Sequence, residues 1–378
     1  MKQLLDAFNF RGFTSSPRSA SALMHPFANA ASPSMNALLR LTGPFKPARD
    51  AWQFPNAGAG LTLEDAAVLR GIYQGFVDDV ALIGVDTLRA ALAALSFTVP
   101  GAGATGLPAA AIDLVVNQIT GDIHNQLADA IIASVPGTYG RCGGFAFSAL
   151  DFFLAGWPID PSIVSYPSTG PIRDFIWTRL INSIQANGAA FLEDFMILKI
   201  LPAISTTASA ALGAIAGSVI GGPLGAVIGG VIAGKDDVLG LGGADKLLGK
   251  TKDSLASLSG FLATHPAWPV GFVYGSQGTI TDEHQVLATG CHDNGNGTAI
   301  LNLWDNAWTG DIRPSCQSID LFLSGSEVVA ASSHQPDYND IKGIICEQYA
   351  PVLPPASLQI PWTDATMPPW SPSDCLPA

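Results

Sequence analysis

The chain has 378 residues, of which 48% are hydrophobic and only 13% are charged. This composition supports a substantial hydrophobic core and argues against disorder over most of the length. The net charge is −13, which opposes a phosphate backbone, and no run of Lys and Arg interleaved with aromatic residues occurs. We therefore expect no binding to nucleic acid.

The first 60 residues are rich in Ser, Ala, Pro and Asn and show no sustained period, which predicts an irregular segment over the surface. The N-terminal run MKQLLDAFNFRGFTSS is interrupted by polar residues and lacks the continuous apolar stretch of a cleaved secretory signal. We expect a protein that is cytoplasmic, exported by a route that needs no cleaved leader, or membrane-associated.

A helix start is well marked at Thr62, because Asp65 stands three residues on, as in a capping box. The apolar spacing continues this helix to about Ile83. Beyond it, the pattern predicts helices over 86–97, 108–133, 143–155, 172–187 (persisting to about 201) and 244–263. Strands are predicted over 269–275, 283–291, 298–304, 318–323, 326–331 and 341–349, with NGNG at 294–297 as a hairpin turn.

Helices first and strands later is the order typical of an α+β protein. We divide the chain into an irregular N-terminal segment (1–60), one α+β domain (61–355) and a Pro-rich C-terminal tail (350–378). Within the domain we expect a helical part over 61–203, a Gly-rich insertion over 204–243, a helix over 244–263 and an antiparallel β part over 268–349.

The first candidate for chemistry is Cys142, in the run Tyr139-Gly-Arg-Cys-Gly-Gly-Phe, just before a helical apolar pattern. A cysteine at a helix N-terminus is close to free N–H groups and the positive end of the helix dipole, which favour the thiolate. The N–H groups of Cys142 and Gly143 can also hold an oxyanion. We expect Gly143 and Gly144 to leave room for a substrate carbonyl, and Arg141 to add positive charge beside the sulfur. The alternative is a buried cysteine with no chemistry.

A nucleophilic thiol needs a base within hydrogen-bond reach, and the base needs an orienting partner. His284 opens one predicted strand, and Asp305 and Asn306 close the next, so a hairpin can bring them side by side. The sequence therefore predicts Cys142 as nucleophile, His284 as general base and Asp305 as its orienter, with Asn306 as the rival orienter.

This arrangement resembles bacterial members of the papain-like cysteine peptidase superfamily. The resemblance lies in the Cys-Gly-Gly-aromatic helix start, in His-Gln-Val-Leu-Ala at 284–288 and in Trp-Asp-Asn at 304–306, and the run at 341–351 resembles the final strand of the same group. It covers roughly 137–187 and 268–355. It implies a papain-like core, a peptide or protein substrate, no cofactor and no metal, and the roles given above for Cys142, His284 and Asp305.

The chain departs from the family pattern before the cysteine. Papain-like enzymes usually place a Gln a few residues ahead of the nucleophile to complete the oxyanion hole, but 136–141 reads Pro-Gly-Thr-Tyr-Gly-Arg. Gln118, Asn125 or Gln126 can take this role from a preceding helix.

Residues 200–234 form a run of 35 positions without a charge. Small residues recur in it every four positions, as in the close packing of membrane helices, and we call this pattern the glycine zipper: Gly213, Gly217, Gly221, Gly225 and Gly229. We expect it to be a helical insertion that contacts a membrane through 205–234, a buried helical hairpin, or a lid over the active site.

Two classes of function follow from these features. The first is a cysteine-dependent hydrolase with a thioester intermediate, acting on a peptide or isopeptide-type bond as a delivered toxin or effector; acyl transfer or glutamine deamidation uses the same triad. The second is a membrane-active or pore-forming protein with a degenerate papain-like scaffold. The four late cysteines (Cys291, Cys316, Cys346 and Cys375) are either two disulfides or reduced thiols.

Overall fold

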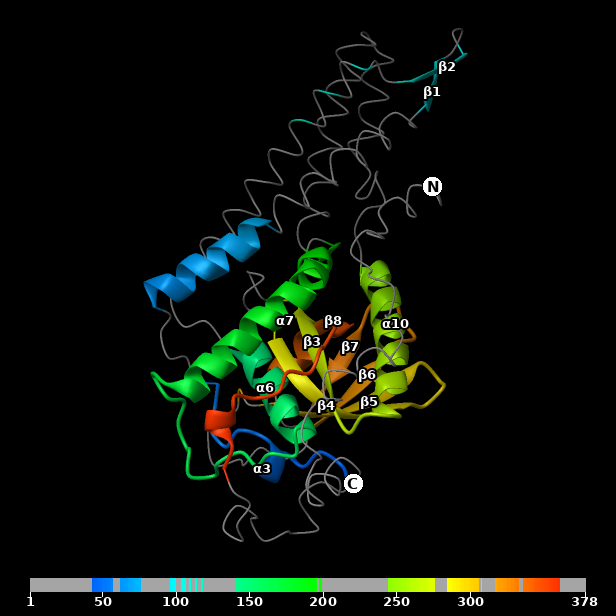
Figure 1. Ribbon diagram of the computed structural model, residues 1–378. Helices are drawn as coiled ribbons and strands as arrows, with labels where there is room; N and C mark the ends of the chain where they lie inside the picture. The colour runs from blue at the N-terminus through cyan, green and yellow to red at the C-terminus, as the bar shows by residue number, and fades with distance from the viewer. Residues whose placement is uncertain are drawn as a thin grey trace.

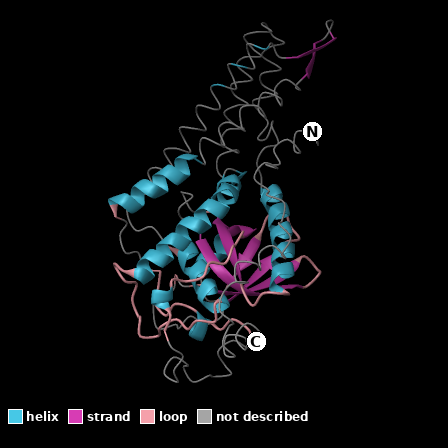
Figure 2. Ribbon diagram, viewed as in Figure 1, coloured by secondary structure: helices cyan, strands magenta, loops and turns pink. Residues whose placement is uncertain are grey.

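The computed structural model describes residues 43–56, 62–75, 141–195, 197–198, 244–275, 284–305, 307, 317–332 and 336–360, the single positions 109, 113 and 117, and the two short strands β1 (Ser96–Val99) and β2 (Gly103–Gly106). Within this part of the chain, helices and an antiparallel sheet occur together, as an α+β protein requires (Figure 2).

The larger sheet has six antiparallel strands in the order β7-β6-β5-β4-β3-β8. Its strands are β3 (Trp268–Tyr274), β4 (His284–Asp293), β5 (Thr298–Trp304), β6 (Gln317–Phe322), β7 (Val329–Ala331) and β8 (Ile341–Cys346). These are the six predicted strands, with boundaries within a few residues. The hairpin turn between β4 and β5 has Gly295 and Gly297 at positive φ, a conformation that glycine adopts without steric cost.

Three long helices cover this sheet: α6 (Cys142–Leu154), α7 (Pro171–Phe195) and α10 (Ala244–Leu262) (Figure 1). The α6 helix packs against α7 and against β4 and β3, whereas α10 packs along β8, β4 and β3. Helix α6 is buried along nearly its whole length, which explains why its sequence is apolar on all sides. The helix that carries the predicted nucleophile is thus the central helix of the described fold.

The described part of the N-terminal segment is less irregular than we predicted. Residues 43–56, here called the strap, include the short helix α3 (Pro47–Asp50) and contribute core side chains. Trp52 donates from Nε1 to Ser148 Oγ of α6 at 2.9 Å, and the ring of Phe54 meets that of Phe145 edge-on at 5.4 Å. The strap therefore belongs to the α+β domain, whose N-terminal boundary we had placed at residue 61.

The predicted capping box is confirmed. Thr62 Oγ1 accepts from the N–H of Asp65 at 3.0 Å, and Asp65 Oδ2 accepts from the N–H of Thr62 at 3.1 Å. Part of the helix predicted over 86–97 is wrong, because residues 96–99 pair with 103–106 as β1 and β2. Val99 and the neighbouring Thr98 are β-branched and precede a Gly-rich turn, which favours a hairpin over a helix end.

The glycine zipper and the C-terminal end of the predicted tail lie outside the described residues. Among the helices that the structure does describe, none is both long enough and apolar enough to cross a membrane. The 3-10 helices η4 (Pro336–Asp340) and η5 (Ala356–Leu358) complete the described elements.

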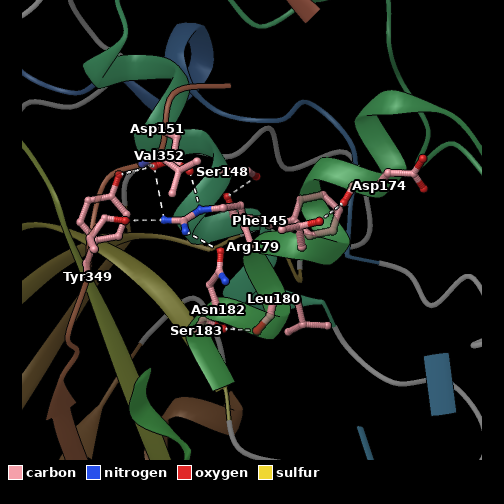
Figure 3. Close-up of polar contacts among 12 residues, drawn as sticks. Phe145, Ser148, Asp151, Asp174, Arg179, Leu180, Asn182, Ser183, Tyr349 and Val352 are labelled. Carbon is pink, nitrogen blue, oxygen red and sulfur yellow. Dashed lines mark hydrogen bonds and ion pairs between the residues drawn. The ribbon is translucent and has the colours of Figure 1, made fainter. Parts of the chain in front are cut away.

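A buried ion pair joins α6, α7 and the chain that follows β8 (Figure 3). Arg179 Nε lies 2.6 Å from Asp151 Oδ2, and both side chains are almost fully buried. Asp151 Oδ1 also accepts from Tyr349 Oη at 2.6 Å and from the N–H of Val352 at 2.9 Å, while Arg179 donates to the carbonyl of Ala350 at 2.9 Å. One carboxylate thus fixes the position of α6 relative to two other segments.

We expect Arg179→Ala to lower the free energy of unfolding by about 3 kcal/mol, because it leaves the buried Asp151 carboxylate without its cation. Urea unfolding followed by circular dichroism measures this. The matched control is Lys342→Ala, whose ion pair with Glu327 at 3.0 Å is partly exposed and should contribute less than about 1 kcal/mol. Equal losses in the two variants would contradict the assigned role of the Asp151–Arg179 pair.

Candidate active site

The Cys142 side chain lies at the N-terminal end of α6, as predicted. Cys142 is the first residue of the helix and is 8% exposed, and its thiol is free of any disulfide. The first N–H groups of a helix have no carbonyl within the helix to donate to, and Arg141 at the N-cap position makes no side-chain capping bond. The sulfur therefore stands beside backbone donors at the positive end of the helix dipole.

The sheet brings His284 and Asp305 together. Leu287 of β4 pairs with Trp304 of β5, and extending this register by one residue sets Asp305 across from Val286. Side chains alternate along a strand, so His284 points to the same face as Val286 and is a diagonal neighbour of Asp305. The His284 Nε2 atom lies 2.8 Å from Asp305 Oδ1.

The thiol and the imidazole also influence each other. The Cys142 sulfur raises the pKa of His284, which means that the two groups are neighbours in the fold. Because Nε2 of the ring is engaged by Asp305, the nitrogen that remains for the sulfur is Nδ1. The structure thus brings together all three residues of the predicted triad from α6, β4 and the end of β5.

The charges around His284 favour its protonated form. Burial of the ring is the largest single influence and lowers its pKa, but the Asp305 carboxylate and the Cys142 sulfur together outweigh burial. The net result is a pKa of His284 well above its ordinary value.

Asp305 is held from three directions. Its Oδ1 accepts from His284 and, at 2.7 Å, from the N–H of Ala307, while its Oδ2 accepts a short hydrogen bond from Tyr338 Oη. Burial acts to raise the pKa of Asp305, yet His284, Tyr338 and Ala307 outweigh it and lower the pKa. The Tyr338 ring packs edge-on against Phe272 of β3, the strand next to β4, with ring centroids 5.5 Å apart. The carboxylate is therefore ionised and fixed.

Gly143 and Gly144 serve a different purpose from the one we predicted. A Cβ at Gly143 would collide with the side chains of Gln285 and Ser183, and a Cβ at Gly144 would collide with the carbonyl oxygen of Ile176 in α7. The two glycines face protein atoms in these directions, so they allow α6 to approach its neighbours closely. This close approach, rather than access for a substrate, is what requires glycine here.

A second buried polar group lies next to the triad. Gln285 follows His284 in β4, accepts from Ser183 Oγ at 3.1 Å and donates from Nε2 to Glu347 Oε1 at 2.8 Å. Glu347 is 1% exposed, and its Oε2 atom has no hydrogen-bond partner in the described structure. Burial raises the pKa of Glu347 to about 8, although Gln285 and His284 act in the opposite direction. Glu347 is therefore largely a neutral carboxylic acid at neutral pH.

The other predicted site features have mixed outcomes. The rival orienter Asn306 and the proposed oxyanion donors Gln118, Asn125 and Gln126 lie outside the described residues. The Arg141 guanidinium lies 4.7 Å from the centre of the Tyr166 ring, so its charge is directed to that ring. Of the late cysteines, Cys291 and Cys346 are free thiols, which rules out a disulfide between these two, and Cys316 and Cys375 lie outside the described part.

Sequence reasoning missed Tyr338, Gln285 and Glu347. Gln285 and Glu347 each stand next to a residue that the sequence did single out, His284 and Cys346, but adjacency along a strand says nothing about a partner on another strand. Tyr338 lies 33 residues after Asp305, in an otherwise ordinary polar turn. No signal in a single sequence identifies it.

Comparison with known proteins identifies no relative: the chain matches no protein family, no curated protein and no solved structure.

We expect Glu347→Gln to change how stability depends on pH. The folded state holds a proton on Glu347 up to about pH 8, whereas the unfolded chain releases it near the ordinary value of 4.5. Glu347 therefore makes the free energy of unfolding fall as pH rises from about 4.5 to about 8, by on the order of 1 kcal/mol per pH unit. The free energy of unfolding of the variant should lack this slope. It should therefore rise relative to that of the wild type toward alkaline pH.

Urea unfolding of both proteins at several pH values across this window measures the difference. A variant that follows the wild-type slope throughout would show that Glu347 is ionised at neutral pH in the folded state.

Proposed function

We propose that the protein is a cysteine-dependent hydrolase with a papain-like core, in which Cys142 is the nucleophile, His284 the general acid–base and Asp305 the residue that orients the ring. The observation that carries this proposal is the bond from His284 Nε2 to Asp305 Oδ1 at 2.8 Å beside a cysteine at the start of α6, whose sulfur raises the pKa of His284. Helix α6 before an antiparallel sheet, with the base on β4, supports the papain-like assignment.

The first half-reaction forms a thioester. The Cys142 thiolate attacks the carbonyl carbon of the substrate, a C–S bond forms, and the carbonyl oxygen becomes an oxyanion beside the N–H groups at the start of α6. His284, protonated in the resting pair, donates its proton to the leaving nitrogen as the C–N bond breaks. The raised pKa of His284 suits it to hold this proton until the nitrogen requires it.

The second half-reaction restores the enzyme. Neutral His284 takes a proton from water, the resulting hydroxide attacks the thioester, and the C–S bond breaks to return the thiolate. Asp305 keeps Nε2 protonated, so Nδ1 is the nitrogen that exchanges protons with water and sulfur. When an amine or alcohol replaces water, the same steps give acyl transfer, and when the leaving group is ammonia they give deamidation.

We expect Cys142→Ala to abolish hydrolysis, lowering kcat by a factor on the order of 10³ or more, because it removes the sulfur on which the proposed thioester forms. A library of fluorogenic peptidyl aminocoumarin amides supplies the substrates, and labelling with iodoacetamide followed by mass spectrometry reports on the thiol directly. Cys291→Ala and Cys346→Ala are matched controls, since both remove a partly buried free thiol away from the triad.

These controls should hydrolyse the amides like the wild type. Unchanged hydrolysis by Cys142→Ala, or labelling of the wild type confined to Cys291 and Cys346, would remove Cys142 from the mechanism.

We expect Asp305→Ala to move the alkaline limb of the pH profile of kcat/KM to lower pH. The rate falls as pH rises through the pKa of His284, and the Asp305 charge raises that pKa. Without the carboxylate, burial of the ring dominates and the pKa of His284 falls. Asp305→Asn separates two contributions, since it keeps a hydrogen-bond acceptor for Nε2 but removes the charge.

The Asn variant should show the larger part of the shift, because the charge is the stronger of the two Asp305 influences on the ring. An alkaline limb at the wild-type position in both variants would contradict the assigned role of Asp305.

A further inference from the structure

The strap ends beside the nucleophile. Trp52 and Phe54 anchor it to α6 through the bond to Ser148 and the ring contact with Phe145, and the last described residue of this part is Asn56. Asn56 Oδ1 accepts from the backbone N–H of Arg141 at 2.7 Å, although the two residues are 85 positions apart in sequence. The Asn56 side chain therefore touches the residue that directly precedes Cys142.

Chemistry fixes which way the Asn56 amide faces. A backbone N–H can only donate, so the atom that it meets must be the carbonyl oxygen of Asn56. The other end of the same planar group is the NH₂ at Nδ2. No hydrogen bond joins this NH₂ to any residue that the structure describes, and Asn56 is partly exposed. Asn56 thus holds an uncommitted pair of donors at the N-terminal end of α6.

The proposed reaction needs a donor at this place. The oxyanion formed on a Cys142 adduct would lie beside the first N–H groups of α6, and a side-chain amide that donates at the same place would stabilise it further. Residues 136–141 contain no such amide. Asn56 reaches the same backbone from another part of the chain, with its carbonyl end already bound to Arg141.

We infer that Asn56 is a further catalytic residue, whose Nδ2 donates a hydrogen bond to the oxyanion that forms when Cys142 attacks an acyl substrate. This inference rests on the proposed function. It makes the strap a part of the active site, in which Trp52 and Phe54 set the position of the amide and the bond to Arg141 sets its orientation. The class of substrate is any acyl compound whose carbonyl oxygen becomes negative in the reaction.

Two substitutions separate this role from a structural one. Asn56→Asp retains an oxygen that accepts from the N–H of Arg141 but replaces the NH₂ with an oxygen that repels an oxyanion. Asn56→Leu removes donor and acceptor together. We expect both to lower kcat for a peptidyl aminocoumarin amide by about 10²-fold, with KM changed much less, as for the loss of one oxyanion-hole donor.

The rate of alkylation by iodoacetamide distinguishes a catalytic role of Asn56 from a structural one. A structural role would lower hydrolysis and alkylation equally. Alkylation at sulfur forms no oxyanion, so it reports the reactivity of the Cys142–His284 pair alone. In each Asn56 variant, the fold-decrease in kcat for amide hydrolysis should exceed the fold-decrease in the alkylation rate by at least about tenfold. Gln53→Leu is the matched control, because the Gln53 amide donates only within the strap, to the carbonyls of Pro47 and Ala51. This variant should keep the ratio of the two rates at its wild-type value.

Parallel losses of acyl transfer and alkylation in Asn56→Asp would overturn the inference and leave Asn56 as a structural residue, and so would full activity of that variant. Failure of the proposed function differs from failure of this inference, because it is seen in the wild type. The wild type would then show no Cys142-dependent release of aminocoumarin and no acylated Cys142 after incubation with a p-nitrophenyl ester. If Cys142 of the wild type is acylated and the Asn56 variants hydrolyse the amide as fast as the wild type, only the role of Asn56 is refuted.

Discussion

The close approach of the N-terminal end of α6 to its neighbours is the constraint on which the site depends. A side chain at position 143 would collide with Gln285 of β4 and Ser183 of α7, and one at position 144 with the backbone of α7, so only glycine allows the helix to sit where it does. That position puts the Cys142 sulfur within reach of His284, the residue that directly precedes Gln285 on β4. A small outward shift of the helix would break the contact between thiol and imidazole without disturbing either element.

Buried polar contacts hold the N-terminal end of α6 in this position. They specify the arrangement of the helices and strands more than they add to the net free energy of unfolding. The ion pair of Asp151 with Arg179 ties α6 to α7 and to the chain after β8, and the bonds of Gln285 to Ser183 and Glu347 tie β4 to α7 and to the end of β8. Desolvation offsets most of what such pairs gain, but a misplaced partner would be left buried and unsatisfied. The network therefore penalises every arrangement except the one in which β4 and α6 meet correctly.

The sequence was sufficient for the strands, for the long helices and for the adjacency of His284 and Asp305. Each carries a local signal: alternation along β4 and β5, a glycine pair after Cys142, and a histidine and an aspartate at matching ends of a hairpin. It was not sufficient for the strap, because single apolar residues such as Trp52 among Pro and Asn show no period even when they enter a core. Tyr338 and Glu347 were missed for a related reason. Their importance comes from partners far away in the sequence, Asp305 for Tyr338 and Gln285 for Glu347, and such long-range contacts are not visible in a single chain's local pattern.

The presence of an aspartate rather than a neutral amide beside His284 has an electrostatic consequence. The His284 ring is nearly enclosed, and burial alone would favour its neutral form. Asp305 reverses this preference only because it stays ionised itself, and it does so because Tyr338 and the N–H of Ala307 donate to it in place of water. The charge on His284 is thus stabilised by Asp305, and the charge on Asp305 by Tyr338. The protonation state of His284 therefore depends on Tyr338 as well as on Asp305.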